Sequence, residues 1–148
     1  MTDEHGDNVW DDLPEIEPGI SGRRLARTEG RPLGGAVWEL DPGSDGVQFH
    51  FHHGTEEYLI VLRGTATLRT YDGELELREG SVVHFPPGRQ GAHTVMNRSD
   101  GPVRYLMIAA HASPDIVEYP DSGTFVAGAR TESQRGERFF VRLPLPDE

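Results

Sequence analysis

The chain has 148 residues, no cysteine and a net charge of −11, from 14 Lys and Arg against 25 Asp and Glu. The lack of cysteine excludes disulfides, thiolate metal sites, iron–sulfur clusters and cysteine nucleophiles. An acidic protein is repelled by a phosphate backbone, so we expect no nucleic-acid partner. This length predicts a single domain, and the 18 glycines and 11 prolines indicate a turn-rich, all-β chain.

The sequence gives no sign of a targeting or membrane segment. Residues 1–5 provide neither a basic region nor an apolar stretch of the secretory type. The longest nearly apolar run is Val103–Ala110, which Arg104 interrupts. A membrane helix needs about 20 apolar residues. We therefore expect a cytoplasmic protein with no membrane partner.

Short strand signals separated by turns begin after an acidic N-terminal arm, residues 1–20, in which Trp10 is suited to dock onto the body or a partner. Residues 21–148 are predicted to be one domain. About ten short strands favour a double-sheet jelly roll or small barrel with extended N- and C-terminal arms. The predicted strands are Arg23–Thr28, Ala36–Leu40, Val47–His52, Glu57–Leu62, Thr65–Tyr71, Glu74–Arg78, Ser81–Phe85, His93–Asn97, Val103–Ala110, Ile116–Tyr119 and Arg138–Leu143.

One hairpin has a strong local signal. Asp72-Gly73 lies between the strands Thr65–Tyr71 and Glu74–Arg78. An Asp-Gly pair between alternating residues is typical of a type I′ turn, which requires positive φ at both central positions. The sequence therefore predicts a type I′ hairpin centred on these two residues.

Histidines and one glutamate are grouped in a pattern that suits a metal ion. His50 and His52 alternate with phenylalanines, and residues i and i+2 of a strand share a face. We expect the two imidazoles to project together, with Phe49 and Phe51 on the opposite face. Glu57 begins the next strand and His93 a distant one. Neutral imidazoles with a carboxylate suit Zn, Fe, Mn, Ni or Cu.

The other histidines favour a simpler interpretation. A single histidine in a strand is more often a surface or core residue than a ligand. We therefore expect His5, His53, His84 and His111 to have no ligand role.

These residues also carry a family resemblance. Gly46-(3)-His50-x-His52-(4)-Glu57-(6)-Gly64 resembles the first motif of the cupin superfamily. Gly80-(5)-Pro86-x-Gly88-(4)-His93-(3)-Asn97 resembles the second. Two spacings depart from the family pattern: the first glycine stands three residues before His50 instead of five, and the loop at residues 89–92 is two residues longer.

The resemblance implies a cupin-like β-barrel with a core at about residues 36–110 and one divalent transition metal per chain, Fe, Mn, Zn or Ni. It carries over His50, His52, Glu57 and His93 as the metal ligands. An octahedral metal with four protein ligands keeps two positions open for chemistry, whereas a tetrahedral zinc would be closed and structural.

Strand parity extends the prediction to a substrate pocket. Residues that share a face with the four expected ligands should line an apolar cavity for a small organic molecule. Arg89 in the longer loop is a candidate clamp for a substrate carboxylate, although a solvated arginine is the simpler interpretation. The candidate pocket residues are Gln48, Leu59, Val61, Arg89, Val95 and Asn97.

Two functional hypotheses stay open at this point. The first is a metal-dependent enzyme acting on a small molecule, as an oxygenase or an isomerase or lyase. The second is a metal-containing module that binds or senses a small ligand without catalysis. We also expect a homodimer, because apolar residues occur on both strand faces, among them Trp38, Leu40, Phe49 and Phe51. The resemblance to cupins, which often pair through barrel faces, implies the same.

Overall fold

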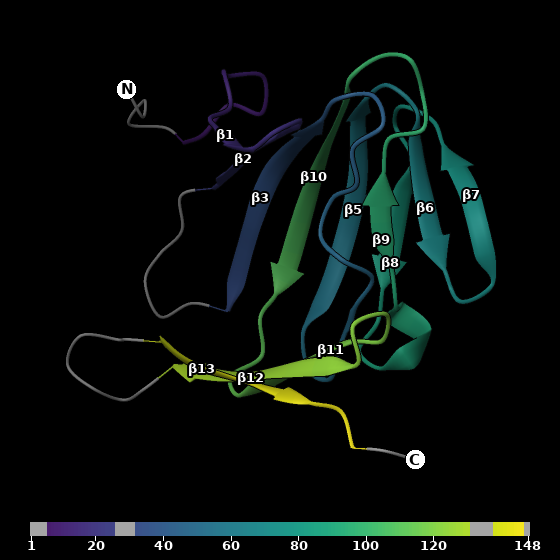
Figure 1. Cartoon of the computed structure of the whole chain (residues 1–148). Coiled ribbons are helices and arrows are strands. Elements are labelled where there is room, and N and C mark those ends of the chain that lie inside the picture. Colours follow the sequence, from purple (N-terminus) through teal and green to yellow (C-terminus); the bar gives the residue numbers. More distant parts are fainter. Residues whose placement is uncertain (1–5, 26–31, 131–137, 147–148) are drawn as a thin grey trace.

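The computed structural model describes residues 6–25, 32–130 and 138–146. Within these ranges the chain forms β-strands and one short 3-10 helix, so the predicted all-β class is confirmed (Figure 1). In the same ranges no helix is long and apolar enough to cross a membrane. His5 and the end of the predicted strand at residues 26–28 lie outside the described residues.

The largest sheet has six strands, five of which correspond to predicted elements. Neighbouring strands pair antiparallel throughout, with β10 between β3 and β5. In spatial order the strands are β1 (Glu15–Glu17), β2 (Ile20–Arg24), β3 (Leu33–Leu40), β10 (Val103–Ala110), β5 (Glu56–Arg63) and β8 (Val82–Phe85).

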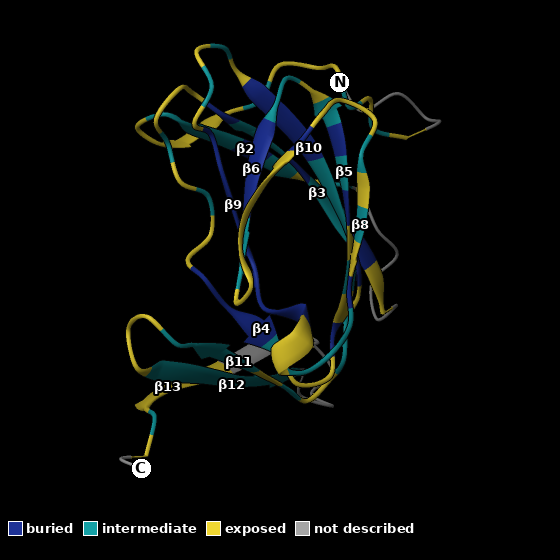
Figure 2. Ribbon diagram, turned by 90° about the vertical axis from the view of Figure 1, so that its right-hand side faces the viewer, coloured by how far each residue is buried: buried dark blue, intermediate teal, exposed yellow. Residues whose placement is uncertain are grey.

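Two smaller sheets complete the barrel. The three-stranded sheet consists of β7 (Gly73–Leu77), β6 (Ala66–Thr70) and β9 (Thr94–Met96). The four-stranded sheet consists of β13 (Arg138–Pro144), β12 (Thr124–Arg130), β11 (Asp115–Tyr119) and β4 (Phe51–His52). In Figure 2 the large sheet faces β6 and β9 across the interior, and the four-stranded sheet lies across one end.

The main core lies between the large sheet and the three-stranded sheet. Removing these side chains from water supplies the principal driving force for closing the barrel, at about 25 cal/mol per Å² of apolar surface. Its buried members come from the strands of both sheets: Leu40, Leu59, Val61, Ala66, Leu68, Leu77, Phe85, Val95, Val103 and Tyr105.

The N-terminal arm is fastened to the barrel through Arg104 of β10. The Arg104 guanidinium is buried, donates to Glu39 Oε2 at 2.7 Å, and donates to the carbonyls of Val9 at 2.9 Å and Asp11 at 3.1 Å. A charged group buried in this way needs such partners to offset its loss of water. Trp10 stays half exposed, with the Arg63 guanidinium 5.2 Å from its ring centroid.

The strand predicted at Val47–His52 is shorter than expected. Regular pairing begins at Phe51, and His50 makes an isolated bridge to His93. Phe49 and Phe51, predicted to lie on the face opposite the two imidazoles, are buried in a second cluster with Ala92. Because the chain itself covers them, they give no support to a homodimer, which stays a prediction.

Two strands were not predicted: the short β1, which lies in the predicted arm, and β12, whose sequence lacks the usual signal. β12 contains Ala127, Gly128 and Ala129 in place of alternating large apolar residues. The strand forms because it pairs with β11 on one side and β13 on the other. Tertiary pairing overrides weak intrinsic strand propensity at this position.

The predicted hairpin between β6 and β7 is confirmed, but its type I′ turn is wrong. Thr70 pairs with Gly73, so Tyr71 and Asp72 form the loop. No non-glycine residue in the described ranges has positive φ, which excludes type I′ geometry at Asp72. Instead, the Asp72 N–H donates to Thr70 Oγ1 at 3.1 Å. Gly73 itself has a φ of 119°.

Replacing this glycine should destabilise the protein through the backbone alone. Gly73→Ala places a Cβ in open space but at a φ that L-residues rarely adopt, so we expect a loss of about 1 kcal/mol or more in the free energy of unfolding. Urea unfolding measures it. Gly101→Ala is the matched control, since Gly101 also faces open space and has no positive φ. Equal stabilities of the two variants would contradict this account.

Candidate metal centre

The backbones of His50 and His93 are joined directly. The His50 N–H donates to the His93 carbonyl at 3.1 Å, and the His93 N–H donates to the His50 carbonyl at 2.9 Å. The two ring centroids are 4.7 Å apart. The reciprocal bonds therefore hold imidazoles from two distant segments of the chain side by side.

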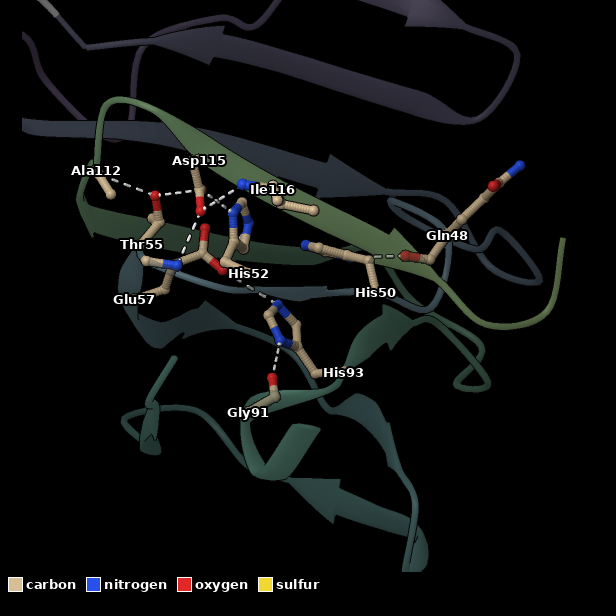
Figure 3. Close-up of polar contacts among 11 residues, drawn as sticks. Gln48, His50, His52, Thr55, Glu57, Gly91, His93, Ala112, Asp115 and Ile116 are labelled. Atoms are coloured by element: carbon tan, nitrogen blue, oxygen red, sulfur yellow. Dashed lines mark hydrogen bonds and ion pairs between the residues drawn. The ribbon is translucent and has the colours of Figure 1, made fainter. Parts of the chain in front are cut away.

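The Nδ1 atoms of three histidines are engaged by acceptors (Figure 3). His50 Nδ1 lies 2.7 Å from the Gln48 carbonyl, and His93 Nδ1 lies 2.8 Å from the Gly91 carbonyl. His52 Nδ1 lies 2.8 Å from Asp115 Oδ2. Carbonyl and carboxylate oxygens only accept, so each Nδ1 carries the proton. In the neutral ring, Nε2 then has a free lone pair, the form that binds a metal.

Glu57 supplies the carboxylate from the start of β5. Its Oε2 lies 3.7 Å from His52 Nε2 and 3.6 Å from His93 Nε2. This oxygen is buried and has no hydrogen-bond partner in the described structure. A buried carboxylate oxygen without a partner is costly, and a cation would relieve that cost. His50, His52 and Glu57 offer ligand atoms within 4.8 Å of one another and could hold a metal ion.

Burial sets the ionisation of the site. It lowers the pKa of His50 to about 4 against the opposing Gln48 carbonyl, and it lowers the pKa of His93 to about 3. Burial also raises the pKa of Glu57. For His52, burial would lower the pKa, but the hydrogen bond to Asp115 and the nearby Glu57 carboxylate outweigh it and raise the pKa. His50 and His93 are therefore neutral at pH 7, as metal ligands must be.

Asp115 is a part of the site that the sequence did not reveal. Besides its contact with His52, it accepts from Thr55 Oγ1 at 2.6 Å and from the Gly54 N–H at 2.9 Å. Burial would raise the pKa of Asp115, but the hydrogen bonds from His52, Thr55 and Gly54 lower it to about 2. Asp115 begins β11, which pairs with β4 at His52. No local motif marks it, because the pairing of two distant strands brings it there.

The loop before His93 explains the longer spacing in the sequence. Residues 89–91 form a 3-10 turn, η1 (Arg89–Gly91), and the Gly91 carbonyl accepts a hydrogen bond from His93 Nδ1. A Cβ at Gly91 would lie 1.9 Å from the Pro86 carbonyl oxygen, so only glycine fits. The Phe85 ring stacks on His93 with centroids 3.6 Å apart. Backbone and ring contacts together fix the orientation of this imidazole.

Two cavities flank the cluster. A cavity of about 190 Å³ is bordered by His50, Glu57 and His93, together with apolar side chains of the large sheet. A second, of about 430 Å³, is bordered by His52 and Asp115 and by the four-stranded sheet. Arg24 and His111 border both. The histidine cluster is thus reachable by a small molecule from two sides.

The structure places only part of the predicted pocket set at these cavities. Val95 borders the smaller one. Leu59 and Val61 are fully enclosed in the main core. Asn97 is buried, and its amide donates to the carbonyls of Leu40 at 2.9 Å and Gly101 at 2.8 Å. Asn97 thus fastens loops rather than a ligand.

The two remaining pocket candidates are exposed. The Gln48 side chain points away from the imidazoles in Figure 3, and its backbone carbonyl alone contacts the site. The Arg89 guanidinium lies 3.8 Å from the ring centroid of Tyr71, in a cation–π contact at the surface. Gln48 leaves the expected face because the chain is not a regular strand at residues 47–50, and Arg89 lies in the loop as expected but does not border either cavity.

The other described histidines lie away from the cluster or at its edge. His53 is exposed, with Nε2 2.7 Å from Glu118 Oε1. His84 is exposed, with Nε2 2.5 Å from Glu56 Oε1. His111 is half-buried beside both cavities.

Comparison with known proteins agrees with the motifs. A family model described as "Cupin domain" matches residues 36–109. A search of curated proteins finds no match. Many solved structures do match.

Three of these solved structures illustrate the range. A structure described as a sugar phosphate isomerase of the cupin superfamily, from Silicibacter pomeroyi, has 25% identity and a TM-score of 0.72, covering 86% of this chain and 77% of its own. One from Acidithiobacillus ferrooxidans, given the same activity provisionally, has 25% identity and a TM-score of 0.64, covering 85% and 79%. A cupin 2 conserved barrel domain protein from Salinispora arenicola has 23% identity and a TM-score of 0.56, covering 68% and 82%.

Removing the negative charge beside His52 should weaken metal binding. Asp115→Asn keeps the shape of the side chain but not its full acceptor strength, so we expect a 10- to 100-fold loss of zinc affinity, on the order seen when such partners of metal-bound histidines are changed. Competition with a chromophoric chelator measures it. Glu118→Gln is the matched control, since Glu118 lies on the same strand but contacts the surface residue His53. An unchanged affinity in Asp115→Asn would show that this contact has no role.

The buried neutral histidines should make the metal-free protein less stable in mild acid. Their pKa values are about 4 and about 3 when folded but about 6.5 when unfolded. Unfolding then takes up protons below about pH 6.5, so stability falls as the pH drops. His52, whose pKa is raised, is protonated in both states there, and Glu57, whose pKa is also raised, opposes the trend.

His93→Asn isolates this effect. Its metal-free stability should depend less steeply on pH than that of the wild type between about pH 4 and 6, by up to about 1.4 kcal/mol per pH unit for one proton. Urea unfolding in chelator at several pH values measures both slopes. Parallel stability curves would refute the assignment.

Proposed function

The chain belongs to the cupin family, and from this premise we propose that it is a mononuclear metal-dependent isomerase of small sugar phosphates or related hydroxylated molecules. The ligands proposed are His50, His52, Glu57 and His93. The observation that supports a metal ion here is the environment of Glu57 Oε2. This atom is buried, has no hydrogen-bond partner among the described residues, and lies near the Nε2 atoms of His52 and His93.

The donor set narrows the choice of metal. Three imidazole nitrogens and one carboxylate oxygen suit Fe, Mn, Zn or Ni. A metal with an open position can act as a Lewis acid on a carbonyl or hydroxyl oxygen of a bound molecule. The surrounding residues orient the ligands: Asp115, Gln48 and Gly91 hold the three Nδ1 protons.

The proposed reaction class is supported by similarity and by the chemistry of the cavity. Two of the compared structures, each with 25% identity to this chain, are described as sugar phosphate isomerases, the second provisionally. Isomerisation moves a proton between neighbouring carbons and consumes no oxidant or co-substrate. A cavity of about 190 Å³ suits a small molecule.

Two residues of the smaller cavity fit roles in such a proton shift. His111 is an imidazole outside the four proposed ligands, and an imidazole can accept and return a proton near neutral pH. Burial raises the pKa of Tyr105, which therefore stays protonated and can donate a hydrogen bond to a substrate oxygen. Both roles belong to the proposal.

Metal analysis of two histidine variants tests the ligand assignment. Wild type and His84→Ala should each contain about one metal ion per chain, because His84 lies at the surface. His52→Ala should lose the metal and melt at a lower temperature, since an ion that binds only the folded state stabilises it. Metal content that is unchanged in His52→Ala would refute the assignment.

The same preparations test the reaction. Isomerisation by proton transfer in D₂O should place deuterium in a sugar phosphate such as ribose 5-phosphate, detected by NMR. We expect incorporation with the metal-loaded wild type and His84→Ala, and none with His52→Ala. Binding of sugar phosphates without exchange would overturn the isomerase and favour the alternative, a metal-containing module that binds a small ligand.

A further inference from the structure

Arg24 occupies a position that the proposed metal site does not explain. It is the only arginine or lysine among the described residues that border either cavity, and it borders both. The carboxylates in the two linings, Glu57 and Asp115, are directed at histidines. A cationic side chain therefore faces the space beside the cluster, in a protein with a net charge of −11.

Strand register places Arg24 on the same face of the large sheet as Glu57. Arg24 pairs with Ala36, and Ala36 pairs with Met107. Ala109, which lies two residues after Met107 on β10, pairs with Glu57. Directly paired residues and residues two apart share a face, so both side chains project toward the interior. Three strand spacings separate them, about 14 Å along the sheet.

The Arg24 guanidinium has no counter-ion among the described residues, although seven other arginines have a nearby acidic or aromatic group. Arg23 illustrates the contrast: it points to the opposite face and lies 3.9 Å from Asp7 and 3.7 Å from Asp11. Arg69, Arg98 and Arg104 pair with carboxylates, and Arg89 stacks on Tyr71. Arg24 is exposed and so accessible to a ligand.

We propose that Arg24 binds the anionic end of the substrate while its hydroxyl or carbonyl end lies at the histidine cluster. This inference deepens the proposed function and rests on it. The planar guanidinium donates two parallel hydrogen bonds, which match the oxygens of a phosphate or a carboxylate. The separation of Arg24 from Glu57 leaves room for a chain of several carbons between the two ends.

The inference also explains how an acidic protein takes an anionic substrate. At long range the net charge of −11 repels anions, but salt screens that repulsion over about 8–10 Å. Inside the cavity the local charges decide, and Arg24 faces a cluster whose two carboxylates, Glu57 and Asp115, are directed at histidines. We therefore expect selectivity for compounds with one charged end over their uncharged counterparts.

Calorimetric titration of ribose 5-phosphate, gluconate and uncharged ribose tests this proposal on the metal-loaded protein. Arg24→Gln should weaken the binding of the preferred anion by about 10-fold or more, as expected for a lost charged hydrogen bond, and leave ribose unchanged. Arg24→Lys keeps the charge without the planar geometry, so its affinity for the anion should lie between those of the wild type and Arg24→Gln. Arg23→Gln is the matched control and should bind like the wild type.

Each outcome decides the matter. Tighter binding of ribose 5-phosphate identifies a phosphate group, and tighter binding of gluconate identifies a carboxylate; both support the proposal if Arg24→Gln removes the preference. The proposal is overturned if Arg24→Gln binds the anions like the wild type, if Arg23→Gln loses as much affinity, or if no anion binds more tightly than ribose.

Repeating the titration in chelator separates this inference from the proposed function. Anion binding that depends on Arg24 without deuterium exchange in any preparation would refute the isomerase and leave the anion site standing. Exchange with the metal-loaded protein that Arg24→Gln does not alter, in either KM or kcat, would refute the anion site and leave the isomerase standing.

Discussion

The candidate site depends on the two reciprocal hydrogen bonds between the backbones of His50 and His93. They join a segment that lies outside regular strands to the beginning of β9, and they bring two imidazoles within 4.7 Å. The large sheet then presents Glu57 to His93 and to His52, which β4 places beside this pair. The bridge thus links histidines from two separate sheets, since His52 lies in the four-stranded sheet and His93 precedes β9 of the three-stranded sheet.

The parts predicted from sequence are those with a local signal. Turn residues and alternating patterns located β5, β8 and β10, and the hairpin of β6 and β7. The spacing of His50, His52 and Glu57 was also sufficient, because residues close in sequence on neighbouring strands have few ways to lie apart. His93 was a candidate by residue type and by its place at the start of a strand, and the family resemblance then carried it over as a ligand, since no local rule links it to His50.

The parts that escaped prediction are set by contacts between distant segments. Phe49 and Phe51 are covered by Ala92 of a distant loop, which the sequence pattern does not show. Gln48 leaves the expected face because the chain is not a regular strand at residues 47–50. Asp115 lies beside His52 only because β11 pairs with β4, and β12 forms only because its neighbours provide hydrogen bonds.

The contact between His52 and Asp115 also sets an order of events during synthesis. The two residues are 63 positions apart, and the strand that carries Asp115 follows β1 to β10 in the chain. While the ribosome is still making that strand, His52 has no carboxylate to accept a hydrogen bond from its Nδ1. A nascent chain that has already made all four proposed ligands therefore lacks the orientation of one of them until β11 is in place.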